Sequence, residues 1–151
     1  MIGRVAITDL SPTIYFGGEF VPVKAIVNEE ILVSATVAGE GHDYPHVQVV
    51  TRDSKGKELT RTSAIERNPG TDRYEATIAL PKLGHFTFEI EASIITQYRT
   101  VTTNSTKFPV YVERERALVG AWYEFFPRSE GAILNKDGTY TSGNFGTAAK
   151  R

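Results

Sequence analysis

The stretch RYEATIALPKLGHFTFEIEA, residues 73–92, decides the fold class of this chain. Each half alternates apolar side chains with polar or small ones, which is the period-two pattern of a half-buried β-strand. The apolar positions of the two halves are Tyr74, Ala76, Ile78, Leu80, Phe86, Phe88, Ile90 and Ala92. Residues 81–84, Pro-Lys-Leu-Gly, have turn composition. We therefore expect two strands joined by a turn, with Glu89 on the solvent face between Phe88 and Ile90.

The same pattern recurs along the chain up to about residue 116. Further strands are expected at residues 4–8, 20–27, 31–37, 46–52 and 108–112, and the Thr-rich stretch 96–106 is also prone to β-structure. Turn clusters separate them, the strongest being Asn-Pro-Gly-Thr-Asp at 68–72. The expected core comprises Val47, Val49, Tyr74, Ile78, Phe86, Phe88, Ile90, Phe108 and Val110. This spacing predicts an all-β protein, an immunoglobulin-like antiparallel β-sandwich over residues 1–116.

Composition excludes several classes of function. The 151 residues include 17 basic and 18 acidic side chains, for a net charge of −1, so no basic excess is available to hold a nucleic acid. There is no cysteine, which rules out disulfides and thiolate chemistry. The three histidines, His42, His46 and His85, are few and scattered. We expect no metal and no cofactor.

The sequence also argues against membrane insertion and export. No apolar run approaches the ~20 residues that a membrane-spanning helix needs. The first ten residues, MIGRVAITDL, lack the basic region and long apolar stretch of a signal peptide. A cytoplasmic location is the expectation.

The composition changes after Arg116. Residues 117–127, ALVGAWYEFFP, are almost continuously apolar, which is typical of a strand buried on both faces in a parallel sheet. Residues 129–146 have loop composition, and a helix is expected to begin at 147–151, with Thr141, Ser142 or Asn144 as its N-cap. Residues 117–151 therefore look like the strand, loop and helix onset of a second domain.

Several motifs resemble one known family. They are the segments at 7–12, 22–25, 40–43 and 69–74, and the run from Arg114 to Ser129 that contains WYEFFPRS. In order and spacing they resemble the α-1,4-glucan:maltose-1-phosphate maltosyltransferases, glycoside hydrolase family 13 members of the bacterial trehalose-to-glucan pathway. The likeness extends over residues 1–92 and again over 107–131.

The resemblance implies an immunoglobulin-like N-domain followed by the first strand of a (β/α)8 barrel, with Gly138-Thr139-Tyr140 leading into the first barrel helix. In that family the nucleophilic Asp and the acid/base Glu lie far downstream, so no catalytic residue is expected here. The family's helical insertion is replaced by a short connection at 93–106. The parent activity implied is retaining transfer of maltosyl units from maltose 1-phosphate to α-1,4-glucans.

On this interpretation the chain is a non-catalytic part that packs on the barrel and contributes to a homodimer. Its α-glucan and maltose 1-phosphate contacts come only through the full-length enzyme. The expected self-association or interdomain surface comprises Leu118, Trp122, Tyr123, Phe125 and Phe126. We expect Trp122 to be buried, either against the sandwich or, preferably, against a second copy of the chain.

Other motifs favour structural roles. The segment Glu40-Gly41-His42-Asp43 is expected to shape a loop, and Asp72-Arg73 a turn with a local ion pair. Two alternative functions stay open: an independent carbohydrate-binding module and a protein–protein adaptor. The first would use exposed aromatic residues, for which Tyr15, Phe16, Tyr44, Tyr98 and Tyr111 are available.

Overall fold

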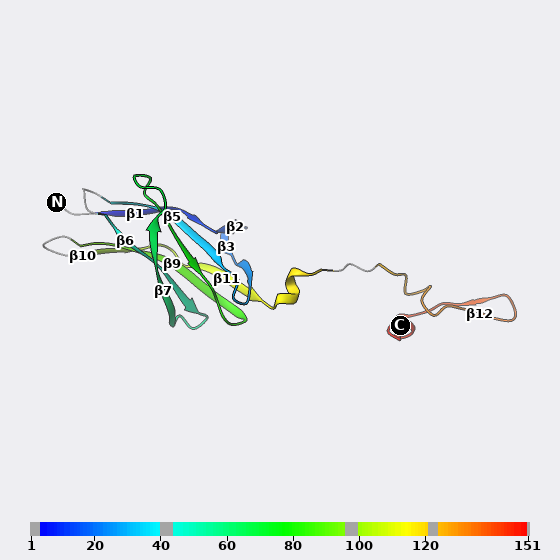
Figure 1. The fold of residues 1–151 in the computed structure, drawn as a ribbon. Coiled ribbons are helices and arrows are strands. Elements are labelled where there is room, and N and C mark those ends of the chain that lie inside the picture. Colours follow the sequence, from blue (N-terminus) through cyan, green and yellow to red (C-terminus); the bar gives the residue numbers. More distant parts are fainter. Residues whose placement is uncertain (1–3, 40–43, 96–99, 121–123, 151) are drawn as a thin grey trace. The chain divides into compact units, whose positions relative to one another are not determined.

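A computed structural model describes residues 4–39, 44–95, 100–120 and 124–150. The chain divides into two compact units, Met1–Val119 and Gly120–Arg151. Each is described by itself (Figure 1).

Strands make up nearly all of the regular structure in the first unit, which confirms the all-β prediction. They are β1 (Val5–Ser11), β2 (Ile14–Phe16), β3 (Glu19–Val21), β4 (Val23–Ile26), β5 (Ile31–Gly39), β6 (His46–Asp53), β7 (Glu58–Glu66), β8 (Arg73–Ile78), β9 (Gly84–Ile95), β10 (Thr100–Asn104) and β11 (Phe108–Glu113). A short 3-10 helix, Glu115–Leu118, follows β11.

The main strands are hydrogen-bonded in the order β1-β5-β8-β7-β6-β9-β11-β4, with β10 also paired to β9. Figure 1 shows β1 and β5 lying over β6, β9 and β10, so the strands form two layers. Strand β7 connects the layers, because residues 60–64 pair with β6 while Ile65 and Glu66 pair with β8. The pairs are antiparallel except for β11 with β4, which run parallel. The expectation of a purely antiparallel arrangement is therefore wrong at this edge.

The core lies between the two layers. All nine predicted core residues are buried, and they form one cluster with inward-facing residues of β5, such as Val33 and Val37. The alternation in β8 and β9 thus predicted the inner face correctly. Burying side chains of this size contributes roughly 1.5–3 kcal/mol each in transfer free energy.

Glu89 differs from the expectation. It lies on the outer face of β9, as the alternation predicts, but is only 4% exposed. The Arg52 Nε donates a 2.8 Å hydrogen bond to the Glu89 Oε1 from the neighbouring strand β6. Because long side chains of neighbouring strands cover this face, Glu89 is buried while its partner Arg52 stays partly exposed. The expectation that Glu89 is exposed to solvent is therefore wrong.

The strand expected at 20–27 is divided. Pro22 separates β3 from β4, and β3 pairs with β2 in a separate two-stranded hairpin. Proline has no N–H to donate to a continuous ladder, which fits the break at this position.

The second unit contains a small hairpin and one turn of helix. Strand β12 (Ile133–Leu134) pairs with β13 (Tyr140–Thr141), where a loop had been expected. Helix α1 (Phe145–Ala148) begins two residues before the expected position, and its N-cap is Asn144, one of the three predicted candidates. Helices of four residues are far too short to cross a bilayer, and no longer one occurs among the described residues.

The expected barrel strand at 117–127 has no counterpart in its described part. Residues 117–118 belong to the 3-10 helix, and residues 119–120 and 124–127 contain no strand. A strand needs a neighbour for its backbone N–H and C=O groups, and the described residues of this segment form no ladder with another strand. Trp122 and Tyr123 lie outside the described residues.

Candidate functional site

The predicted association surface is exposed wherever it is described. Leu118, Phe125 and Phe126 are all exposed large apolar residues. Leu118 belongs to the first unit and the two phenylalanines to the second, and the proposal that they share one surface stays a prediction. The predicted burial of Trp122 falls outside the described residues and stays a prediction.

Polar contacts organise the second unit. The Thr147 Oγ1 donates to the Glu130 carbonyl oxygen at 2.8 Å, and Thr147 also forms a capping box with Asn144. The Gly143 N–H donates to the Arg128 carbonyl oxygen at 2.9 Å. A Cβ at position 143 would lie 1.9 Å from the Glu130 carbonyl oxygen, so only glycine fits.

The large apolar side chains that are described in this second unit are exposed. Ile133, Leu134, Tyr140 and Phe145 are exposed, as are Phe125 and Phe126. The unit therefore presents apolar surface that its own described residues do not cover. Exposed patches of this kind mark interaction surfaces in soluble proteins.

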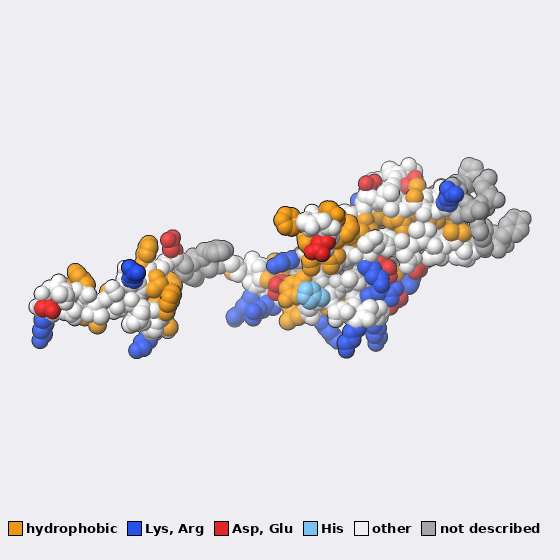
Figure 2. Space-filling view, turned by 180° about the vertical axis from the view of Figure 1, so that it is seen from behind, with side chains coloured by type: hydrophobic (Ala, Val, Ile, Leu, Met, Phe, Trp, Pro, Cys, Tyr) orange, Lys and Arg blue, Asp and Glu red, His pale blue; other side chains and the backbone are white. Residues whose placement is uncertain are grey.

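The first unit carries a second exposed apolar feature, the β2–β3 hairpin. Figure 2 shows it as a group of hydrophobic side chains at the surface. Tyr15 and Phe20 are directly opposite in the hairpin register, and their ring centroids lie 5.1 Å apart at an interplanar angle of 69°. The Phe20 ring in turn lies 4.7 Å from that of Phe108, which reaches the core.

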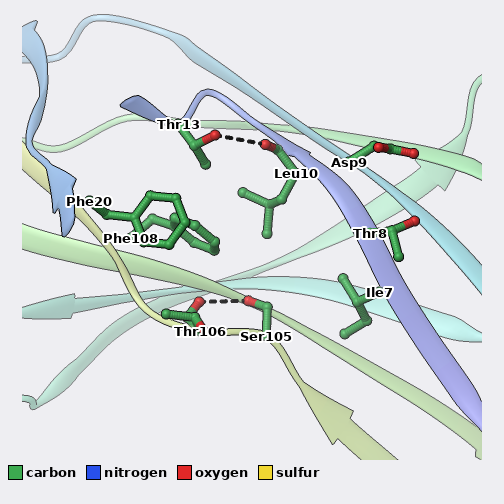
Figure 3. A pocket seen from close by; sticks show the side chains of 9 residues that line it. All are labelled: Ile7, Thr8, Asp9, Leu10, Thr13, Phe20, Ser105, Thr106 and Phe108. Atoms are coloured by element: carbon green, nitrogen blue, oxygen red, sulfur yellow. Dashed lines mark hydrogen bonds between the residues drawn. The ribbon is translucent and has the colours of Figure 1, made fainter. Parts of the chain in front are cut away.

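Next to this hairpin is an open hollow of about 390 Å³. In Figure 3, Ile7 and Leu10 of β1 lie across the hollow from Phe20 and Phe108, and Ser105 and Thr106 close one end. The Thr13 Oγ1 donates to the Leu10 carbonyl oxygen at 3.1 Å, and the Ser105 Oγ donates to the Thr106 carbonyl oxygen at 2.8 Å. The hollow thus combines aromatic and aliphatic walls with hydroxyl groups held in place.

Of the other aromatic candidates, Tyr44 is highly exposed in the segment before β6, and Tyr111 packs on His85 at 4.5 Å. Tyr98 lies outside the described residues. The structure therefore pairs Tyr15 with Phe20, which is not among the aromatic residues predicted to be available for sugar stacking. The signal that was available is the Gly17-Gly18 pair, which indicates a two-residue hairpin turn and so places Tyr15 opposite Phe20.

A charged network covers the outer face of β6, β7 and β9. Glu58 accepts from the guanidinium of Arg61 at 3.1 Å, and Arg61 also pairs with Glu91. The hydrogen bond from Arg61 holds the pKa of Glu58 below its ordinary value. We interpret this network as structural, because it ties three neighbouring strands together.

The predicted Asp72–Arg73 ion pair is not formed. Arg73 instead donates from Nη1 to the Asp9 carbonyl oxygen at 2.7 Å and from Nη2 to the Ser34 Oγ at 2.6 Å. Asp72 has a φ of 55°, consistent with its place in the predicted turn. The guanidinium therefore extends to β1 and β5, where a carbonyl oxygen and hydroxyl oxygens accept its hydrogen bonds.

His42 and Asp43, of the loop predicted at 40–43, lie outside the described residues. Within the described ranges, no group of three His, Cys, Asp or Glu residues is placed to hold a metal ion.

Comparison with known proteins gives a consistent result. The family "Alpha-1,4-glucan:maltose-1-phosphate maltosyltransferase, domain N/S" matches residues 3–94. Alpha-1,4-glucan:maltose-1-phosphate maltosyltransferase 1 of Streptomyces coelicolor is 28% identical over 229 aligned positions, which take in all of this chain and 33% of that protein. The maltosyltransferase of Mycobacterium tuberculosis H37Rv is 39% identical over 93 positions, 60% of this chain and 12% of that protein.

The comparisons also show two differences in length between this chain and its relatives. The chain spans about a third of the Streptomyces relatives that it matches from end to end. The 229 aligned positions exceed the 151 residues of this chain, so the relative carries additional residues within the matched region.

Proposed function

Because the chain belongs to the family of the maltosyltransferase domain N/S, we propose that it is the N-terminal, non-catalytic part of an enzyme that elongates α-1,4-glucans from maltose 1-phosphate. The observation that carries this proposal is the family match over residues 3–94 together with relatives that align along the whole chain. The transfer breaks the bond between maltose and phosphate and forms a new α-1,4 bond, and the proton of the acceptor hydroxyl leaves with the phosphate.

The proposal assigns an immunoglobulin-like sandwich to residues 1–116. Two strand layers around one core support it, as does the parallel pairing of β4 with β11 at an edge. Residues 117–151 are proposed to be the first strand, loop and helix onset of a glycoside hydrolase family 13 barrel. The exposed apolar side chains of the second unit support this, since neighbouring barrel elements would cover them.

The chain's own role is to pack on the barrel and to contribute to a homodimer, in a cytoplasmic enzyme. Leu118, Trp122, Tyr123, Phe125 and Phe126 are the proposed contact residues. Retaining glycosyl transfer uses a pair of carboxylates held about 5–5.5 Å apart. We propose that the barrel, rather than this chain, supplies both of them.

A chimera tests the proposal. This chain replaces the matched region of the Streptomyces coelicolor maltosyltransferase 1, and phosphate release from maltose 1-phosphate is measured with maltohexaose as acceptor. The relative lacking that region and the 151-residue chain alone are the controls. We expect the chimera to release phosphate and the isolated chain to release none. Activity of the isolated chain, or a folded but inactive chimera, contradicts the proposal.

A further inference from the structure

The β2–β3 hairpin is a rigid aromatic corner at the surface of the first unit. Its turn residues Gly17 and Gly18 both have positive φ, 65° and 93°, as a two-residue hairpin turn requires. The Tyr15 hydroxyl donates to the Gly18 carbonyl oxygen at 2.9 Å, which fixes the ring against the turn. The strands pair only with each other among the described residues, so the hairpin extends from the main sheet.

A continuous set of ring contacts links this corner to the core. Tyr15 packs on Phe20, Phe20 on Phe108, and Phe108 on Phe88 at 5.7 Å. Phe88 is only 1% exposed, whereas Tyr15 is 65% exposed and Phe20 is 38% exposed. The outer rings are therefore held in place by buried ones, and a ligand that stacks on them does not have to order them first.

The two faces of the hairpin differ. Tyr15 and Phe20 share the face that adjoins the hollow, while strand alternation places Ile14 and Phe16 on the opposite face. Phe16 is 76% exposed, and it takes no part in the ring contacts described above. Phe16 is therefore a matched control for Tyr15, with similar size and exposure on the other face.

The lining of the hollow indicates a neutral, hydroxyl-rich ligand. Its polar side chains are the hydroxyls of Thr8, Thr13, Ser105 and Thr106 and the carboxylate of Asp9, with no lysine or arginine. Asp9 is exposed, and its carboxylate has no hydrogen-bond partner among the described residues. The guanidinium of Arg73 binds the Asp9 carbonyl oxygen and Ser34 but forms no ion pair with the Asp9 carboxylate. A carboxylate without an ion-pair partner disfavours phosphorylated ligands, whereas it accepts hydrogen bonds from sugar hydroxyls.

We propose that the Tyr15–Phe20 face and the adjoining hollow form a binding site for an α-1,4-glucan chain, separate from the catalytic centre of the parent enzyme. The C–H face of a glucose ring stacks on Tyr15, the more exposed of the two rings, with Phe20 bordering it, and the hydroxyl edge of the sugar lies toward Asp9 and Thr13. The choice of glucan rests on the proposed function, since the relatives are named as α-1,4-glucan maltosyltransferases. Such a site holds a polymeric acceptor near the enzyme while its end reacts.

The test is an NMR titration of the full 151-residue chain with maltoheptaose, with cellohexaose as the β-1,4-linked control. We expect maltoheptaose to shift the amide signals of Gly17 and Gly18, with a dissociation constant on the order of 1 mM. The Tyr15→Ala variant is expected to bind about tenfold more weakly. Phe16→Ala and Tyr44→Ala are expected to bind like the original chain.

The outcomes separate this inference from the proposed function. Absence of maltoheptaose binding overturns the glucan site, as does equal loss in Tyr15→Ala and Phe16→Ala. Self-association that Tyr15→Ala abolishes, without glucan binding, assigns the face to a protein partner and also overturns it. Phosphate release by the chimera is measured independently, so an active chimera with a chain that does not bind glucan leaves the proposed function standing.

Discussion

The two units of this chain are stabilised by different interactions. In the first, apolar side chains from two strand layers meet in one buried cluster. In the second, the backbone is held by caps and turn hydrogen bonds, while the large apolar side chains of its described residues remain exposed. The difference teaches that a small segment can acquire local structure from polar contacts alone, whereas burial of apolar surface needs a partner.

The core of the first unit gives the largest expected effect. Phe88→Ala should lower the free energy of unfolding by about 3–5 kcal/mol, because it leaves a cavity between the two layers. Phe145→Ala is the matched change in the second unit, where the ring is 77% exposed, and it should cost within about 0.5 kcal/mol. Chemical denaturation of both variants measures the difference. Equal losses would mean that Phe145 is covered in solution.

The ion pair between Glu89 and Arg52 gives the next effect. Glu89→Ala should lower the free energy of unfolding by about 1–3 kcal/mol, because it leaves the guanidinium of Arg52 without its closest acceptor. Glu124→Ala, at an exposed position of the second unit, is the control and should have little effect. A Glu89→Ala variant as stable as the original chain would show that the pair contributes nothing net.

The sequence predicted those strands in which apolar and polar side chains alternate, with one face buried in the core. Strands β8 and β9 were located in this way, and their inner residues are in the core. Strand β7 was not, because its side chains are mostly exposed or half-buried and it is held by backbone pairing to both layers. Alternation alone does not reveal such a strand.

The candidate site was predicted less well. The apolar run at 117–127 suggested a strand, but a continuous apolar run specifies burial rather than a conformation, and its described part contains none. Likewise, the outer-face position of Glu89 was predictable, while its burial depends on where Arg52 extends from the neighbouring strand. Tyr15 was recognised as available, yet its pairing with Phe20 depends on the hairpin register.

Glycine contacts provide a smaller, local test in the second unit. Gly143→Ala should open the contact with the Glu130 carbonyl oxygen, because the new Cβ would overlap that atom. We expect faster hydrogen exchange at the amides of residues 143 and 147, by about tenfold for each 1.4 kcal/mol lost locally. Gly120→Ala, where nothing lies within 4 Å of the new Cβ, is the control. Unchanged exchange in Gly143→Ala would show that this unit does not hold its structure through that contact.

The smallest expected effect concerns two exposed carboxyl groups, one in each unit. The pKa of Glu58 is lowered first by its hydrogen bond from Arg61, and that of Asp137 first by its hydrogen bond from the Thr139 hydroxyl. A pKa lower in the folded than in the unfolded chain means that each ionised carboxylate favours folding. That stability is present above the unfolded pKa, about 4, and is lost as the pH falls through the folded value.

High salt distinguishes the charged donor at Glu58 from the uncharged donor at Asp137. At 1 M ionic strength the Debye length is about 3 Å, so the attraction between Glu58 and the cation of Arg61 is screened. Salt weakens the hydrogen bond from the uncharged Thr139 hydroxyl to Asp137 much less. NMR titration should therefore show the pKa of Glu58 rising toward its ordinary value in 1 M salt, while that of Asp137 stays low. Arg61→Gln should reproduce the rise at Glu58 in low salt. If salt moves both groups equally, the two units do not differ in how they hold their exposed carboxylates.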